Sequence, residues 1–222
     1  MWLQQLPHGI NLHNVVLWID GDISAVDRIT KTAHTWTDVT QGAGKAGATY
    51  LDFEGTTANL VATLPTVFDS IATTDHSVAC WMNADNLTAG GTFNRVFEAF
   101  FDANNFAQFN INNNNAIQYV VEDATTQRRA GSTAVLAVTV DAFIVGTWDA
   151  SANTLALYVN GVAHAEAGDV STPGDTKELV LGVRSDEAAS TWYNGRISNF
   201  MVFDKVLTPA QVGQMYNKHN KA

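Results

Sequence analysis

The residues best suited to molecular recognition lie in the segment STWYNG, residues 190–195. Trp192 and Tyr193 supply aromatic rings that can stack on a sugar, and Asn194 supplies a planar amide that can bond its hydroxyl groups. The sequence therefore predicts Trp192, Tyr193 and Asn194 as ligand-binding residues in a loop between the last strands. The competing interpretation is structural, because Trp192 can equally cover the end of the fold.

A second candidate site is the triplet Asp20-Gly21-Asp22. Two carboxylates on either side of a flexible glycine are hard oxygen ligands, which makes Asp20 and Asp22 candidate calcium ligands. A turn whose aspartates accept hydrogen bonds from backbone amides explains the same pattern. No other cofactor is expected.

Enzyme signatures are missing elsewhere in the chain. The segment GAGKAG has Ala46 after Lys45, where a phosphate-binding loop needs Ser or Thr. There is no G-x-S-x-G motif, and the six histidines form no H-E-x-x-H motif. Asp52 and Glu54 alternate on one strand, and a solvated strand face is the expected explanation. We therefore expect a protein that is not an enzyme.

The elements that must position these residues are strands. Apolar and polar residues alternate with a period of two, and turn residues interrupt the pattern at short intervals, which predicts an all-β, antiparallel sandwich. The expected strands are 15–20, 49–54, 59–63, 76–83, 95–101, 106–111, 116–122, 135–140, 142–148, 154–159, 162–167, 178–183 and 195–203.

The segment TLALYVNGVAHA predicts a hairpin in detail. Asn160-Gly161 accepts the positive φ angles of a type I′ turn, which places Val159 opposite Val162 and Tyr158 opposite Ala163. One face is strongly apolar, so we expect a sheet that is buried on one side only. A second hairpin is expected to turn at the four asparagines 112–115.

The C-terminal segment LTPAQVGQMYNKHN predicts a short helix. Thr208 is a good N-cap, Pro209 fits the first helical position, and Gln211 completes a capping box. Val212 and Met215 lie on one stripe that can pack against the sandwich.

Composition narrows the function classes. Twelve Lys and Arg against twenty-two Asp and Glu give a net charge of −10, which disfavours binding to nucleic acid or anionic lipid. The sequence contains no run of about 18 apolar residues, so no membrane-spanning segment is predicted. The single cysteine, Cys80, forms no internal disulfide and is expected to be a buried apolar residue. We expect one domain over residues 1–222, with residues 1–14 either an arm that docks on a neighbouring subunit or a strand folded back on the domain.

Several segments together resemble laminin-G-like and pentraxin-like domains of the concanavalin A-like lectin/glucanase superfamily. They are DAFIVGTWDASANTLALYVNGVAHAEAG, the closing LVLGVRSDEAASTWYNGRISNFMVFDKVLTPAQVGQMYN, and the earlier YLDFEGTTANLVAT and HSVACWMNADNL. The resemblance implies a jelly-roll sandwich of two antiparallel sheets, one of them concave. Members often carry an acidic pair where this chain has Ser198 and Asn199, which argues against a calcium site of the family type. The E-x-D-x-x-E pattern of the family's glucanases is also missing.

Two function classes remain. The first is a virion structural, decoration or tail-adhesion protein of a tailed bacteriophage, whose partners are other virion proteins or its own copies. It is favoured because the chain starts without an export signal and lacks disulfides, as expected for a particle assembled in the host cytoplasm. The alternative is a carbohydrate-binding lectin module of a secreted or cell-surface bacterial protein, with an extracellular location and a glycan as partner.

Overall fold

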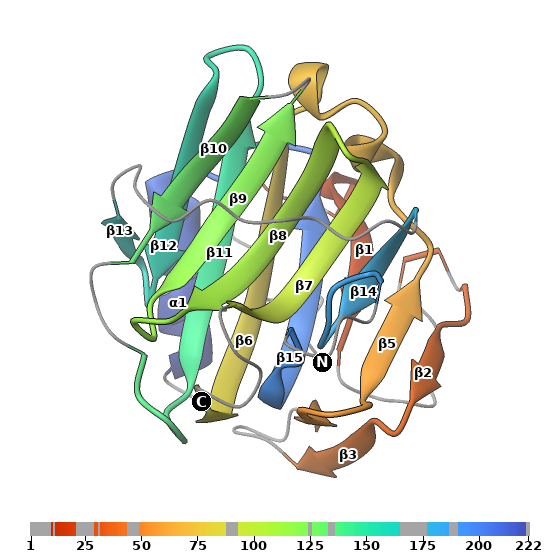
Figure 1. The fold of residues 1–222 in the computed structure, drawn as a ribbon. Coiled ribbons are helices and arrows are strands. Elements are labelled where there is room, and N and C mark those ends of the chain that lie inside the picture. Colours follow the sequence, from red (N-terminus) through yellow and green to blue (C-terminus); the bar gives the residue numbers. More distant parts are fainter. Residues whose placement is uncertain are drawn as a thin grey trace.

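The structure is a computed structural model that describes residues 10, 12–20, 29–30, 32–43, 49–87, 93–123, 126–132, 136–164, 177–186 and 191–220. Two antiparallel sheets stack face to face, and a short helix lies behind one of them (Figure 1). The predicted all-β sandwich with a C-terminal helix is confirmed.

The two sheets contain all the described strands. Sheet A has the order β13 (Val162–His164), β12 (Thr154–Val159), β11 (Ala142–Asp149), β6 (His76–Asn86), β15 (Asn194–Phe203), β4 (Thr49–Glu54) and β3 (Thr40–Ala43), and β1 (Val15–Ile19) follows β4 along the same edge of β15. Sheet B has the order β10 (Thr126–Gly131), β9 (Ile117–Asp123), β8 (Asn105–Asn112), β7 (Phe93–Asp102), β14 (Glu178–Leu181), β5 (Asn59–Ala62) and β2 (Thr35–Thr37). Short 3₁₀ helices occur at Leu12–Asn14, Thr66–Phe68 and Ile71–Thr73.

The main core lies between the sheets and is rich in aromatic rings. Phe97 of sheet B lies 4.9 Å from Phe109 in an edge-to-face arrangement and 5.2 Å from Phe200 of sheet A, measured between ring centroids. Each buried phenylalanine contributes about 1.5–3 kcal/mol of transfer free energy. Cys80 is fully buried in this core, and burial raises the pKa of its thiol, so it is an apolar core residue as expected.

Helix α1 (Pro209–Asn220) covers part of the outer face of sheet A. It starts with the predicted capping box, in which the Gln211 side chain accepts from the Thr208 backbone N–H at 2.9 Å. Val212 and Met215 are buried in one apolar cluster with Tyr158, whose exposure is 6%. The expectation that this hairpin is buried on one side only is therefore wrong, because the helix covers its second face.

Both predicted hairpin turns are confirmed. Asn160 and Gly161 have φ angles of 52° and 80°, and Tyr158 pairs with Ala163 as expected. In the asparagine turn, the Asn112 side chain accepts from the backbone N–H groups of Asn114 and Ala116 at 3.0 and 3.1 Å.

Three short strands, β2, β3 and β10, were not predicted. Each lies at the edge of a sheet and lacks a clear apolar alternation, so its strand conformation depends on pairing with a neighbour. The expected strand at residues 135–140 is wrong for its described part. Residues 136–140 form no strand, and Thr139 has a φ of 60° and donates its N–H to the Ala84 carbonyl.

Candidate functional site

The predicted trio Trp192, Tyr193 and Asn194 does not form one exposed surface. Trp192 is 7% exposed and packs with Val180 on the outer face of sheet B. Tyr193 is fully buried in the core, 6.3 Å from the Phe53 ring, and burial raises the pKa of its hydroxyl well above the usual value. Asn194 begins β15 in sheet A and is half-buried. The packing of Trp192 agrees with the interpretation that it covers part of the sandwich.

The candidate calcium ligands are only partly described. The backbone carbonyl of Asp20 accepts from the Thr49 hydroxyl at 3.2 Å, and Asp22 lies outside the described residues. Within the described ranges, no three His, Cys, Asp or Glu side chains are placed to hold a metal ion. The Asp20–Asp22 site therefore stays a prediction, and nothing below depends on it.

The polar residues that do come together lie on the outer face of sheet B. In Figure 1 the strands β7, β8 and β9 of this sheet lie in front of sheet A. The strand register sets Arg95 beside Asn110 and Asn110 beside Gln118, and it sets Glu98 beside Gln108 in the next row. Residues opposed in this way point to the same side of a sheet. We call these five residues the polar face; each is at most 1% exposed.

Apolar groups flank the polar face on both sides. Phe100, Phe106 and Val120 form one cluster, and Trp192 with Val180 belongs to another. Polar groups that converge between apolar walls are typical of sites that orient a ligand.

Gln108 is the most unusual member of the polar face. It is fully buried, and neither Nε2 nor Oε1 has a hydrogen-bond partner among the described residues. Leaving a buried amide unsatisfied costs about 1–3 kcal/mol. The position is therefore one where a donor and an acceptor from a ligand would stabilise the protein.

A described turn, residues 182–186, lies over the polar face. The Ser185 backbone N–H donates to Glu98 Oε2 at 2.7 Å, and this bond is buried. In the same turn Arg184 donates from Nε and Nη2 to the two carboxylate oxygens of Asp186, each at 2.6 Å. Burial lowers the pKa of Arg95 to about 10, and the nearby Glu98 charge opposes this shift, so the guanidinium remains charged at neutral pH.

The polar face offers several hydrogen-bonding groups to a ligand. Amide, guanidinium and carboxylate groups can donate to and accept from a hydroxyl-rich ligand. Glycoside hydrolysis commonly needs two carboxylates on either side of the bond to be cleaved, whereas Glu98 is the single carboxylate in the polar face as defined by its five described residues. Sequence analysis identified none of the five; uncharged amides at alternating positions of neighbouring strands are the signal that could have found them.

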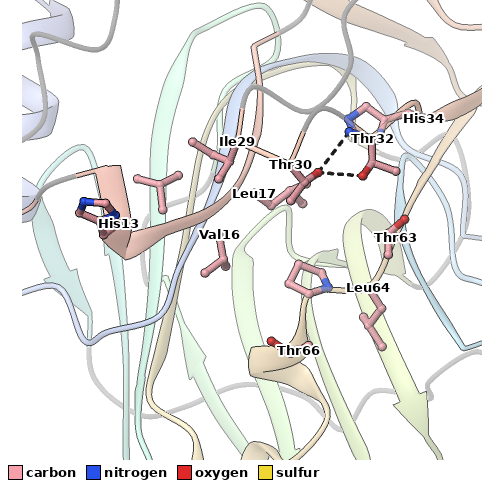
Figure 2. A pocket seen from close by; sticks show the side chains of 12 residues that line it. His13, Val16, Leu17, Ile29, Thr30, Thr32, His34, Thr63, Leu64 and Thr66 are labelled. Carbon is pink, nitrogen blue, oxygen red and sulfur yellow. Dashed lines mark hydrogen bonds between the residues drawn. The ribbon is translucent and has the colours of Figure 1, made fainter.

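A separate cavity of about 500 Å³ lies between β1, the described residues 29–30 and 32–34, and the segment 63–66. Apolar side chains such as Leu17, Ile29 and Leu64 line it, together with threonine hydroxyls (Figure 2). His13 and His34 lie at opposite ends of this cavity in Figure 2, so they form no imidazole pair. The cavity contains none of the residues of the polar face.

The two stacked antiparallel sheets define a lectin-like jelly-roll domain. The family model Laminin_G_3, described as the concanavalin A-like lectin/glucanases superfamily, matches residues 54–213. The chain belongs to this superfamily, as the sequence resemblance indicated.

Solved structures share this fold at low sequence identity. Domain 4 of AbnA, a GH43 extracellular arabinanase from Geobacillus stearothermophilus solved with arabinotriose, has a TM-score of 0.68 and 15% identity, and the match covers 91% of this chain and 98% of that domain. The receptor-binding domain of a botulinum neurotoxin C/D mosaic serotype has a TM-score of 0.69 and 17% identity, covering 93% of this chain and 51% of that one. A structure of botulinum neurotoxin type C, a toxin whose cell entry depends on interaction with two ganglioside molecules, has a TM-score of 0.67 and 13% identity. The match covers 93% of this chain and 51% of that one. The chain thus spans about half of the toxin domains.

A comparison with curated protein sequences gave no match. None of the helices in the described part of the chain is long and apolar enough to cross a membrane.

Proposed function

We propose that this protein is a carbohydrate-binding module that binds a glycan on the polar face of sheet B. The observation that carries the proposal is Gln108, a buried amide with no hydrogen-bond partner among the described residues. Its superfamily includes lectins, and the arabinanase domain of similar fold was solved with arabinotriose. A sugar hydroxyl both donates and accepts, which matches the two unused groups of one amide.

Binding in this site requires the turn 182–186 to move. The Ser185 N–H donates to Glu98 Oε2 while the turn lies over the polar face. A sugar hydroxyl would replace this N–H as the donor to Glu98. Gln108 and Arg95 then bond neighbouring hydroxyl groups, while the Trp192 cluster supplies apolar surface for the C–H face of the sugar ring.

The test is Gln108→Leu, which removes both polar groups and keeps much of the side-chain volume. Two neutral hydrogen bonds contribute about 1 kcal/mol each, so glycan affinity should fall about tenfold to thirtyfold. Replacing an unsatisfied buried amide by an apolar group should leave the free energy of unfolding equal to or above that of the wild type. Binding is measured on a glycan array that includes arabinotriose and ganglioside oligosaccharides, with and without calcium.

The matched control is Gln127→Leu, the same change on the edge strand β10, where the side chain donates to Glu122 at 3.0 Å. This variant should bind like the wild type. A wild-type protein that binds nothing on the array, or a Gln108→Leu protein that binds as well as the wild type, would contradict the proposal.

We also propose that the protein is not an enzyme. The single carboxylate of the polar face supports this, since hydrolysis of a glycosidic bond commonly uses a pair. Incubation with each polysaccharide that is bound should release no reducing ends. Release that is lost in Glu98→Gln would overturn this view.

For the biological setting, we propose a virion decoration or tail-adhesion protein of a tailed bacteriophage, with virion proteins or its own copies as partners. In support, the fold contains one buried cysteine and needs no disulfide, which suits assembly in the reducing host cytoplasm. The alternative is a module of a secreted or cell-surface bacterial protein. Mass spectrometry of purified phage particles distinguishes the two, because the polypeptide must be a component of the particle in the first case.

A further inference from the structure

A second group of polar and aromatic residues lies on the outer face of sheet A, on the other side of the sandwich. The register sets Arg196 of β15 between Asp52 of β4 and Asn83 of β6, so these three side chains share one face. The Arg196 guanidinium lies 4.9 Å from the centre of the Tyr50 ring. With Asp85, these residues form what we call the sheet A patch.

The hydrogen-bonding groups of the sheet A patch are only partly used. Arg196 lies 3.8 Å from Asp52 Oδ2 and 3.9 Å from Asp85 Oδ2, distances longer than a direct hydrogen bond. Asn83 donates through Nδ2 to Asp141 at 2.7 Å, while its Oδ1 is buried and has no hydrogen-bond partner in the described part of the chain. Asn83 is 8% exposed, so this acceptor is withdrawn from bulk water. The patch therefore has both donor and acceptor capacity left.

The patch is accessible from solvent, unlike the polar face. The side chains of Arg196, Asp52 and Asp85 are 40%, 32% and 33% exposed. Trp81, two residues before Asn83 on the same face of β6, is half-buried and stacks with Tyr216 at 6.1 Å between ring centroids. Aromatic rings thus border the polar row on the side of helix α1.

The charges and the hydrogen-bonding groups of the sheet A patch indicate which class of ligand it can bind. Three carboxylates, those of Asp52, Asp85 and Asp141, outnumber the single guanidinium of Arg196, so an anion is repelled. A purely cationic ligand would satisfy the acceptors but would meet Arg196, which already lies between two of the carboxylates. A neutral polyhydroxyl ligand satisfies both kinds of group, because each hydroxyl donates to a carboxylate or to Asn83 Oδ1 and accepts from Arg196. Its C–H surface can lie against Tyr50 and Trp81.

We infer that the sheet A patch is a second binding site, and that its ligand is a neutral glycan. This inference rests on the proposed carbohydrate binding for its ligand class and on the sheet A residues for its location. Two sites on opposite sides of one sandwich would let a single chain bridge two glycans or hold one multivalent surface with increased avidity.

The test uses Arg196→Met, which keeps an unbranched apolar side chain at this position and removes the guanidinium that lies over Tyr50, with its donors. Wild type, Arg196→Met, Gln108→Leu and the double variant are compared on an array of neutral oligosaccharides that includes arabinotriose. Gln108→Leu should bind about tenfold to thirtyfold more weakly than the wild type and keep the remaining binding through the sheet A patch, and Arg196→Met should keep binding through the polar face. The double variant should bind at least about tenfold more weakly than either single variant. Lys218→Met on helix α1 is the control for loss of one positive charge, and its glycan binding should equal that of the wild type.

The outcomes separate the two proposals. If Gln108→Leu removes all binding and Arg196→Met changes nothing, the sheet A site is wrong and the polar face stands. If Arg196→Met removes all binding and Gln108→Leu changes nothing, the sheet A site stands and the polar face is wrong as the binding site. A wild-type protein that binds no glycan overturns both.

Discussion

Acid should destabilise this protein through one buried histidine, His76. This residue starts β6 and is fully buried between the sheets. Its Nε2 lies 2.7 Å from the Tyr119 hydroxyl of sheet B, and its Nδ1 lies 3.2 Å from the Thr74 carbonyl. Because a carbonyl only accepts, Nδ1 carries the proton and donates to Thr74, and Nε2 accepts from Tyr119. The neutral imidazole thus links the two sheets.

The size of the effect follows from the shift in the pKa of His76. Burial lowers this pKa from 6.5 to about 4, and the hydrogen bond to Thr74 opposes the shift only in part. The unfolded chain therefore binds a proton at pH values where the folded protein does not. The stabilising contribution of the neutral ring is complete above pH 6.5 and is lost as the pH falls to about 4, which amounts to roughly 3 kcal/mol.

The measurement compares wild type with His76→Gln, whose amide can still accept from Tyr119 and does not titrate in this range. Urea unfolding followed by tryptophan fluorescence gives the free energy of unfolding of both proteins between pH 4 and 8. Other titrating groups cancel in the difference, which should be constant above pH 6.5 and should then move in favour of the variant by roughly 3 kcal/mol. Tyr119→Phe is the control: it loses about 1 kcal/mol at neutral pH and keeps the wild-type pH dependence. A difference between wild type and His76→Gln that stays flat down to pH 4 would refute the reasoning.

Two further changes test the backbone of the sandwich and its helix. In Gly195→Ala the new Cβ would lie 2.2 Å from the Asn83 carbonyl oxygen at a φ of +147°, so we expect a loss of about 3 kcal/mol or more in urea unfolding. The control Gly213→Ala meets nothing within 4 Å on α1 and should gain up to about 1 kcal/mol; equal effects of the two changes would contradict the steric argument. Thr208→Ala removes the hydroxyl that accepts from the Gln211 N–H at 3.3 Å and should lower stability by about 1 kcal/mol, and an unchanged melting temperature would argue against the cap.

Local chemistry was enough to predict the hairpin at residues 154–164 and the helix α1. The turn needs two residues that tolerate positive φ, and Asn160-Gly161 is a pair of neighbours in the sequence. The capping box of α1 likewise depends on Thr208 and Gln211, three residues apart. In both cases the interacting groups are close along the chain, so the sequence contains the whole interaction.

The edge strands β2, β3 and β10 could not be predicted because their own residues carry no apolar alternation. β2 (Thr35–Thr37) pairs with β5 (Asn59–Ala62), which is distant in the sequence. β3 and β10 pair with their sequence neighbours β4 and β9 but have no apolar alternation of their own. Nothing in a short polar segment indicates that a free strand edge will be beside it. The same holds for Trp192, whose partner Val61 lies far away in the sequence.

The alternation of apolar and polar residues along a strand shows that the strand has two different faces. It does not show what packs on the outer face of each sheet. Charge content discriminates between the two faces here. The sheet A patch is built mainly from charged groups such as Asp52 and Arg196 and stays partly exposed, since burying an unpaired charge is expensive. The polar face of sheet B is built mainly from amides such as Gln108, whose burial costs much less. The two charges it does bury, Arg95 and Glu98, are opposite in sign, and Glu98 also accepts from a backbone N–H. Amides at alternating strand positions are thus the pattern to expect in a covered polar site, and charges the pattern of an open one.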